Sequence, residues 1–196
     1  MTIRAENSLI HWNYFLALES DLASISRYIE FDEKNFDTFS IELARLLLAS
    51  ASEVDVIAKG ICEFLDPKAR PQGIFDYQKI IIGSLPEFAD ETVFLPRYNL
   101  KFQPWTDWRK GAHPTWWTSY NKVKHHRGDR FNEANLRNTL HSMGGLLISV
   151  FYYYKLKFIH YGKPVRRNDD VINLLPEHLG LLHLNDSYYP KRLLLD

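Results

Sequence analysis

A short basic segment, residues 120–127, carries the side chains in this chain that are best suited to chemistry. On a helix, 100° per residue places a phenol, an amide and an ammonium on one face, with an imidazole and a guanidinium on its two flanks. These side chains are Tyr120, Asn121, Lys124, His125 and Arg127. Such a face could bind phosphate and supply a general acid or base, because histidine titrates near physiological pH. The alternative is an ordinary helix C-terminus, where the helix dipole favours Lys, His and Arg.

Two carboxylates earlier in the chain are candidate partners for these cations. Asp55 falls within the apolar stripe of a predicted helix, and a carboxylate in such a place needs a partner. If that helix packs on the basic one, the cations of residues 120–127 are the nearest partners, and a structural ion pair is favoured over a catalytic role. Glu53 lies outside the stripe. The candidate binding residues are Lys122, Lys124, Asp55 and Glu53.

Charge is distributed unevenly, although the formal net charge of the chain is zero. Residues 1–66 carry 12 Asp and Glu against 5 Lys and Arg, whereas residues 97–130 carry 8 Lys and Arg against 2 Asp. The basic third is therefore a candidate surface for a polyanion. Alternatively, the acidic and basic segments pack beside each other and neutralise.

Apolar residues at three- and four-residue spacing predict two helices in the first third of the chain. The first is expected within residues 8–31. The second begins after Asp37, which can serve as its N-cap, and Pro67 stops it. Its wide apolar stripe indicates a helix that is buried along one side.

Two further helices are predicted after residue 113. Pro114 suits the first turn of the helix that carries the basic face, and Gly128 offers a C-terminal stop just after Arg127. Asn132 can cap the last helix, in which the pair Gly144-Gly145 would permit close approach of a neighbouring helix. Four amphipathic helices predict a bundle.

The remaining segments are rich in proline, which predicts irregular structure. Residues from about 67 to 113 are expected to form an irregular insertion, with a short helix near 75–82 and an extended piece at 97–102. Residues 162–196 are expected to form an irregular C-terminal tail. The predicted fold class is all-α, a four-to-five-helix bundle, with residues 1–196 as a single domain.

Composition argues against several classes of protein. No run of about 18 apolar residues occurs, and the N-terminus lacks a basic region followed by an apolar run, so we expect a cytoplasmic protein with no membrane partner. Cys62 is the only cysteine and cannot form an internal disulfide. We expect no metal site and no cofactor, because the histidines do not fall at the three- or four-residue spacing of a helical metal pair. They include His113, His125, His126 and His141.

The run from Trp116 to His125, WWTSYNKVKH, resembles the signature helix of the HEPN superfamily, and residues 52–59, SEVDVIAK, resemble the acidic helix that faces it. The resemblance implies a helical bundle. The family pattern is an arginine, a polar residue, three further residues and a histidine, which in ribonuclease members form a metal-independent site between two protomers. Asn121 matches the polar position and His125 the histidine, whereas Tyr120 occupies the position of the arginine.

The resemblance implies a metal-independent endoribonuclease or an RNA-binding protein of phage defence or a toxin–antitoxin system. In the catalytic form, His125 would be the general acid or base, and Asn121, Lys124 and Arg127 would hold the phosphate, with Lys124 or Arg127 replacing the missing arginine. The alternative is a non-catalytic dimeric interaction or nucleotide-binding module.

The expected partners are RNA or a nucleotide, a second copy of the chain, and an antitoxin or defence protein. Aromatic side chains that we expect to be exposed would suit the homodimer interface. They are Trp105, Trp108, Trp116 and Trp117. A third interpretation is a small helical protein in which the basic helix is an ion-paired core element.

Overall fold

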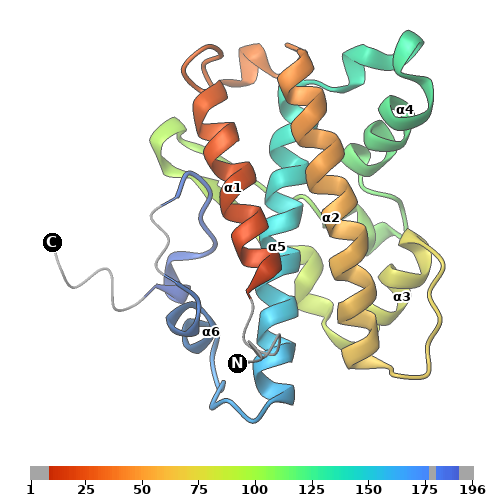
Figure 1. Cartoon of the computed structure of the whole chain (residues 1–196), viewed down its shortest axis with the longest axis vertical. Helices are drawn as coiled ribbons and strands as arrows, with labels where there is room; N and C mark the ends of the chain where they lie inside the picture. The colour runs from red at the N-terminus through yellow and green to blue at the C-terminus, as the bar shows by residue number, and fades with distance from the viewer. Residues whose placement is uncertain (1–8, 177–179, 190–196) are drawn as a thin grey trace, which may run out of the picture.

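The computed structural model describes residues 9–176 and 180–189, and these residues are mainly α-helical (Figure 1). The six α-helices within them are α1 (Ile10–Ile25), α2 (Ile41–Leu65), α3 (Ile74–Ser84), α4 (Thr115–Arg130), α5 (Leu136–His160) and α6 (Asn168–Leu174). Two short strands, β1 (Val93–Leu95) and β2 (Leu100–Phe102), form an antiparallel pair in which Phe94 lies opposite Lys101. The predicted mainly helical bundle is confirmed.

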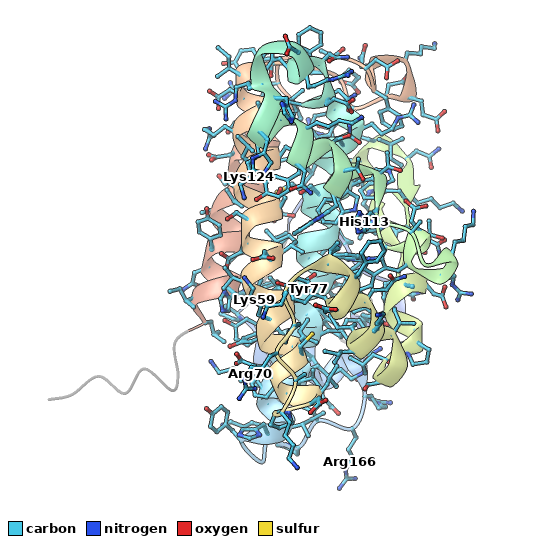
Figure 2. The ribbon with its side chains drawn as sticks, turned by 90° about the vertical axis from the view of Figure 1, so that its right-hand side faces the viewer. Lys59, Arg70, Tyr77, His113, Lys124 and Arg166 are labelled. Carbon is cyan, nitrogen blue, oxygen red and sulfur yellow. The ribbon has the colours of Figure 1, made fainter. Side chains whose placement is uncertain are left out.

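The centre of the bundle is α5, which lies behind α1 and α2 in Figure 1 and contacts α1, α2, α4 and α6. Figure 2 shows α4 above α3, and both pack on α2. Two glycines of α5 allow neighbours to come close, as predicted, but those neighbours are bulky side chains. A Cβ on Gly145 would lie 2.9 Å from Trp116, and one on Gly144 would lie 2.6 Å from Phe102. The bundle therefore places the start of α4 directly against the central helix.

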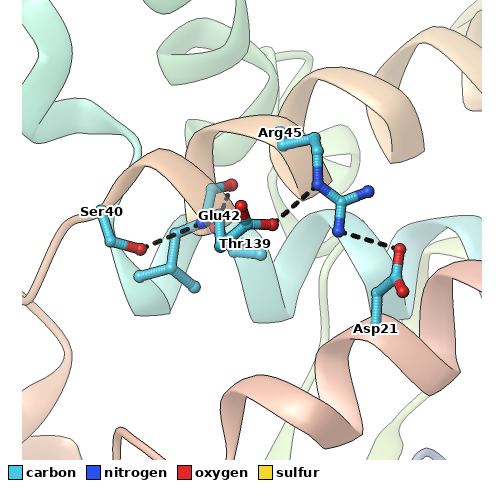
Figure 3. Close-up of polar contacts among 6 residues, drawn as sticks. Asp21, Ser40, Glu42, Arg45 and Thr139 are labelled. Atoms are coloured by element: carbon cyan, nitrogen blue, oxygen red, sulfur yellow. Dashed lines mark hydrogen bonds and ion pairs between the residues drawn. The ribbon is translucent and has the colours of Figure 1, made fainter.

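The N-terminus of α2 is fixed by side chains from three helices (Figure 3). The Ser40 hydroxyl accepts a hydrogen bond from the backbone N–H of Leu43 at 3.2 Å, which makes Ser40 the N-cap. The hydroxyl of Thr139 on α5 donates to the Leu43 carbonyl at 3.2 Å. Arg45 bridges Glu42 and Asp21 of α1 at 2.8 and 2.9 Å. The prediction of Asp37 as the N-cap is wrong, because the helix begins after Ser40.

The segment between α2 and α4, predicted to be an irregular insertion, contains α3, the β1–β2 pair and several 3₁₀ turns. The predicted short helix corresponds to α3, and β2 lies within the predicted extended piece. The description as an irregular insertion is wrong, because this segment supplies large side chains to the core, among them Tyr77, Phe88 and Trp105.

The C-terminal region after residue 162 is also less irregular than expected within the described residues. It contains α6, and His183 pairs with Phe94 of β1 through two backbone hydrogen bonds of 2.8 and 2.9 Å. The Tyr188 hydroxyl donates to buried Glu91 at 2.7 Å. This region packs on the bundle as predicted, while the predicted tail at residues 177–179 and 190–196 lies outside the described residues.

The four tryptophans expected at an exposed interface are buried in the monomer. Trp105 and Trp108 lie 4.3 Å apart between ring centroids, and the Trp116 indole N–H donates to the Pro104 carbonyl at 2.8 Å. Trp117 packs edge-on against Trp116. The expectation that these four side chains form a dimer interface is wrong, because their area is already buried within one chain.

Among the described residues, the model contains no helix with both the length and the apolar character needed to cross a membrane.

His141 on α5 lies stacked on Phe102, with ring centroids 4.5 Å apart. Burial, with a smaller contribution from Arg137, lowers the pKa of His141 to about 4. As the pH falls, His141 is protonated at a higher pH in the unfolded chain than in the folded chain, because a free histidine has a pKa of about 6.5. Stability that is present above pH ~6.5 is therefore lost as the pH falls toward 4, by up to about 3 kcal/mol.

This pH dependence can be measured by urea denaturation of wild type and His141→Gln at neutral and at mildly acidic pH. The variant should lose less free energy of unfolding than wild type over the same interval. An equal loss in both proteins would contradict the assignment to His141.

Candidate functional site

The predicted basic face lies on α4, but the helix is interrupted where the face ends. His126 has φ −135° and ψ 41°, which is not helical, and the chain then continues in helical form to Arg130. The helix therefore does not stop at Gly128. Arg127 lies beyond the kink, so helical spacing no longer relates it to Asn121 and Lys124, and its predicted place on the flank of one continuous face is wrong.

Tyr120, at the position of the family arginine, is a core residue with 6% of its surface exposed. Its ring packs against Trp117 at 5.3 Å between centroids. The ammonium of Lys124 lies 5.4 Å from the centre of the Tyr120 ring, which is within the range of a cation–π contact. The tyrosine is therefore placed to support the Lys124 side chain, and its burial argues against Tyr120 as one of the candidate catalytic residues, which by the sequence were His125, Asn121, Arg127 and Tyr120.

Asn121 and His125 lie on the side of α4 that is not packed into the core. The Asn121 side-chain amide donates to the Trp117 carbonyl one turn earlier, at 3.1 Å. His125 is exposed, and within the described part of the chain it forms no hydrogen bond, ion pair or ring contact. The imidazole is thus free to meet a ligand, but no neighbouring carboxylate orients it.

Lys122 turns toward the next element rather than toward the predicted face. Its ammonium forms an ion pair with Glu133 at 2.6 Å, and the Ser119 hydroxyl donates to the same carboxylate at 2.7 Å. The Lys122 hydrogen bond, followed by that of Ser119, lowers the pKa of Glu133. Lys122 therefore holds α4 to the following 3₁₀ turn, η6 (Phe131–Glu133), instead of standing beside Asn121.

The hydrogen-bond partners of Asp55 belong to α2 and α3, so the prediction that it pairs with the cations of α4 is wrong. One carboxylate oxygen accepts from Lys59 at 2.5 Å, and the other accepts from the buried Tyr77 hydroxyl at 2.9 Å. Burial and this hydrogen bond raise the pKa of Tyr77. Figure 2 shows Lys59 and Tyr77 near each other, with Lys124 farther along the molecule.

Glu53 also lies away from the basic face. Its carboxylate is 2.5 Å from Nδ1 of His11 on α1, and each of these side chains is only 17% exposed. The His11 ring packs edge-on against Tyr153 of α5 at 4.9 Å. This pair links three helices, and the sequence did not single out His11 because nothing in its spacing relates it to Glu53.

The last part of α4 carries a group of exposed basic or titratable side chains that follow one another closely in the chain. We call this group the basic end of α4, and it comprises Lys124, His125, His126, Arg127 and Arg130. All five are exposed, and the only carboxylate within the same run is Asp129. Sequence analysis did not name His126 and Arg130 as site residues. Arg130 entered only the charge count. The kink at His126 could not be predicted, because no proline marks it in the sequence.

Other sites for chemistry are sparse among the described residues. No group of three or more His, Cys, Asp and Glu side chains is arranged to hold a metal ion there. Cys62 is buried, and burial raises the pKa of its thiol to about 12, which leaves little reactive thiolate. A comparison with known proteins found no matching family model, curated protein or solved structure.

Proposed function

We propose that the protein is a HEPN-like RNA-binding protein whose basic end of α4 holds the phosphates of the strand. The observation that carries this proposal is the exposure of five basic or titratable side chains on one short stretch, with only Asp129 among them. Phosphate contacts supply most of the affinity of nucleic-acid binding and require cations that are free to approach the backbone. The near-zero net charge of the chain makes this local concentration the relevant feature.

Lys124 is the proposed substitute for the missing arginine. Its ammonium lies over the ring of Tyr120, the residue that occupies the arginine position of the family pattern. An aromatic face attracts a cation and restricts its conformations, so the ammonium is held over Tyr120 and samples fewer positions in solvent. A cation so placed would stabilise the negative charge that develops on a phosphate.

The proposed ribonuclease activity uses His125 without a metal. The ribose 2′-hydroxyl attacks the adjacent phosphorus as a general base removes its proton, and the 5′-oxygen of the next nucleotide leaves with a proton from a general acid. One histidine can serve as only one of these groups at a time. The second would come from the His125 of another protomer, in the homodimer that the resemblance implies.

Cleavage can be tested by incubating the full chain with mixed RNA in the presence of EDTA. Wild type should cut, and His125→Ala should lose about 100-fold or more in rate. The control His160→Ala, which replaces an exposed histidine outside the basic end of α4, should retain activity. The same strand with 2′-deoxyribose should stay intact. Intact RNA with wild type, or equal cutting by His125→Ala, would refute the catalytic form.

A second candidate function, a non-catalytic dimeric interaction or nucleotide-binding module, is favoured by two observations. Tyr120 is buried where catalysis by the family mechanism needs an arginine, and His125 has no orienting partner within the described residues. The outcome that supports this candidate is binding of RNA or a nucleotide without cutting. A phage-defence or toxin–antitoxin setting, with an antitoxin or defence protein as partner, is proposed for both forms.

A further inference from the structure

An exposed aromatic side chain lies beside the basic end of α4. Phe39, which precedes α2, is 50% exposed. Its ring contacts that of Phe131 in a T-shaped arrangement, with centroids 5.7 Å apart. Phe131 directly follows Arg130, the last residue of α4. The chain therefore places an open aromatic ring next to a group of cations that come from a distant part of the sequence.

The ring is held by a rigid backbone. The segment before α2 runs antiparallel to the start of α5, where the carbonyl of Thr38 accepts from Leu136 at 2.9 Å and that of Phe36 accepts from Arg137 at 3.1 Å. Phe39 itself forms a β-bridge with Asn135. A ring fixed in this way loses little conformational freedom when a ligand stacks on it.

Two arginines lie close in the chain to the rings around Phe39. Arg130 precedes Phe131, and the guanidinium of Arg137 lies 5.0 Å from the centre of the Phe36 ring. The carboxylates nearest in sequence to Phe39 are Asp37, which is exposed, and Glu42, which is paired with Arg45. Those nearest to Phe131 are Asp129, which is exposed, and Glu133, which is paired with Lys122. Glu42 and Glu133 are each paired with a cation, so the exposed Lys124, Arg127 and Arg130 of the basic end of α4 are the cations that a polyanion near Phe131 would meet.

We propose that Phe39 is a stacking surface for an unpaired base of an RNA strand whose phosphates lie on the basic end of α4. This inference rests on the proposed RNA-binding function and adds the substrate class, since only an unpaired base can leave its neighbours to stack on a side chain. Open aromatic rings next to cations are the usual elements of single-strand binding, because every base offers a π face and every nucleotide a phosphate.

A matched control is available nearby. Ile41, the first residue of α2, is 75% exposed and lies two residues from Phe39, but it has no ring on which a base can stack. If this apolar surface instead bound a protein or a second copy of the chain, both side chains would contribute. Stacking predicts that Phe39 matters and Ile41 does not.

The test measures binding of the full chain to a labelled single-stranded RNA and to a duplex of the same sequence. Phe39→Ala should weaken single-strand binding by about 5- to 100-fold, the range for loss of one stacked base, and should leave duplex binding unchanged. Phe39→Tyr should restore single-strand affinity, and Ile41→Ala should bind like wild type. Folding of each variant is checked by its urea midpoint.

The outcomes separate this inference from the proposed function. Wild-type affinity in Phe39→Ala, or an equal loss in Ile41→Ala, would overturn the stacking role while leaving RNA binding in place. A wild-type protein that binds neither RNA would refute the proposed function and the stacking role together. A variant that loses duplex and single-strand binding alike would also overturn base stacking.

Discussion

Replacing Trp116 by alanine is expected to lower the free energy of unfolding by about 3–5 kcal/mol. Trp116 is 1% exposed, its ring packs on Gly145 of the central helix, and it meets Trp105 edge-on at 5.1 Å. Its removal would leave a large cavity between α4 and α5. It would also leave the Pro104 carbonyl without the hydrogen bond that the indole donates.

Urea denaturation measures this loss, and Trp116→Phe is the control because it retains most of the apolar volume while losing only the N–H donor. The control should lose clearly less stability than Trp116→Ala. The opposite expectation, that Trp116 lies at a dimer interface, predicts a change in the mass of the assembly with little change in monomer stability. That result would contradict the packing described above.

The long helices were predictable because their apolar positions repeat without interruption. Both α2 and α5 carry an apolar residue every three or four positions over 25 residues, a pattern that local sequence shows without knowledge of their packing partners. Their starts were less predictable. The N-cap of α2 is Ser40 rather than Asp37, because the segment between them pairs with the start of α5, a contact that local sequence does not reveal.

The segment from α3 to α4 was misjudged because proline content reports where helices break, and not whether a segment is buried. Five prolines occur in residues 67–113, yet Trp105 and Trp108 in this segment fill the core beside Phe88. Sequence alone shows that these rings are large and apolar. Whether they meet one another or a second protein depends on how the chain folds back on α5.

In the candidate site, too, some features could be predicted from local sequence and others depend on the whole fold. Helical spacing placed Tyr120, Asn121 and Lys124 on one face, but it could not tell which of these side chains packs into the bundle. Tyr120 and Asn121 are neighbours in the chain and lie 100° apart around the helix, yet Tyr120 is buried in the core and Asn121 is partly exposed. The partner of Asp55 was equally hidden, because Tyr77 belongs to a helix whose placement on α2 depends on the whole fold.

Neutralising three cations of the basic end of α4 should remove most of the RNA affinity. The variant combines Lys124→Gln, Arg127→Gln and Arg130→Gln. Each lost phosphate contact reduces the dependence of log affinity on log salt by about 0.7 for a single strand, so the slope should become shallower by about 2. At low salt the affinity should fall by about 100- to 1000-fold. Stability should change little, because all three side chains are exposed.

A matched variant separates a local site from a general charge effect. It removes the same charge from exposed cations elsewhere: Lys68, Lys79 and Arg166. Figure 2 shows Arg166 at the end of the molecule opposite α4. If RNA affinity depended only on net charge, both triple variants would weaken binding equally and the two salt slopes would coincide. If the basic end of α4 contacts the phosphates, the control keeps the wild-type slope, because counterions are released only where cation and phosphate meet.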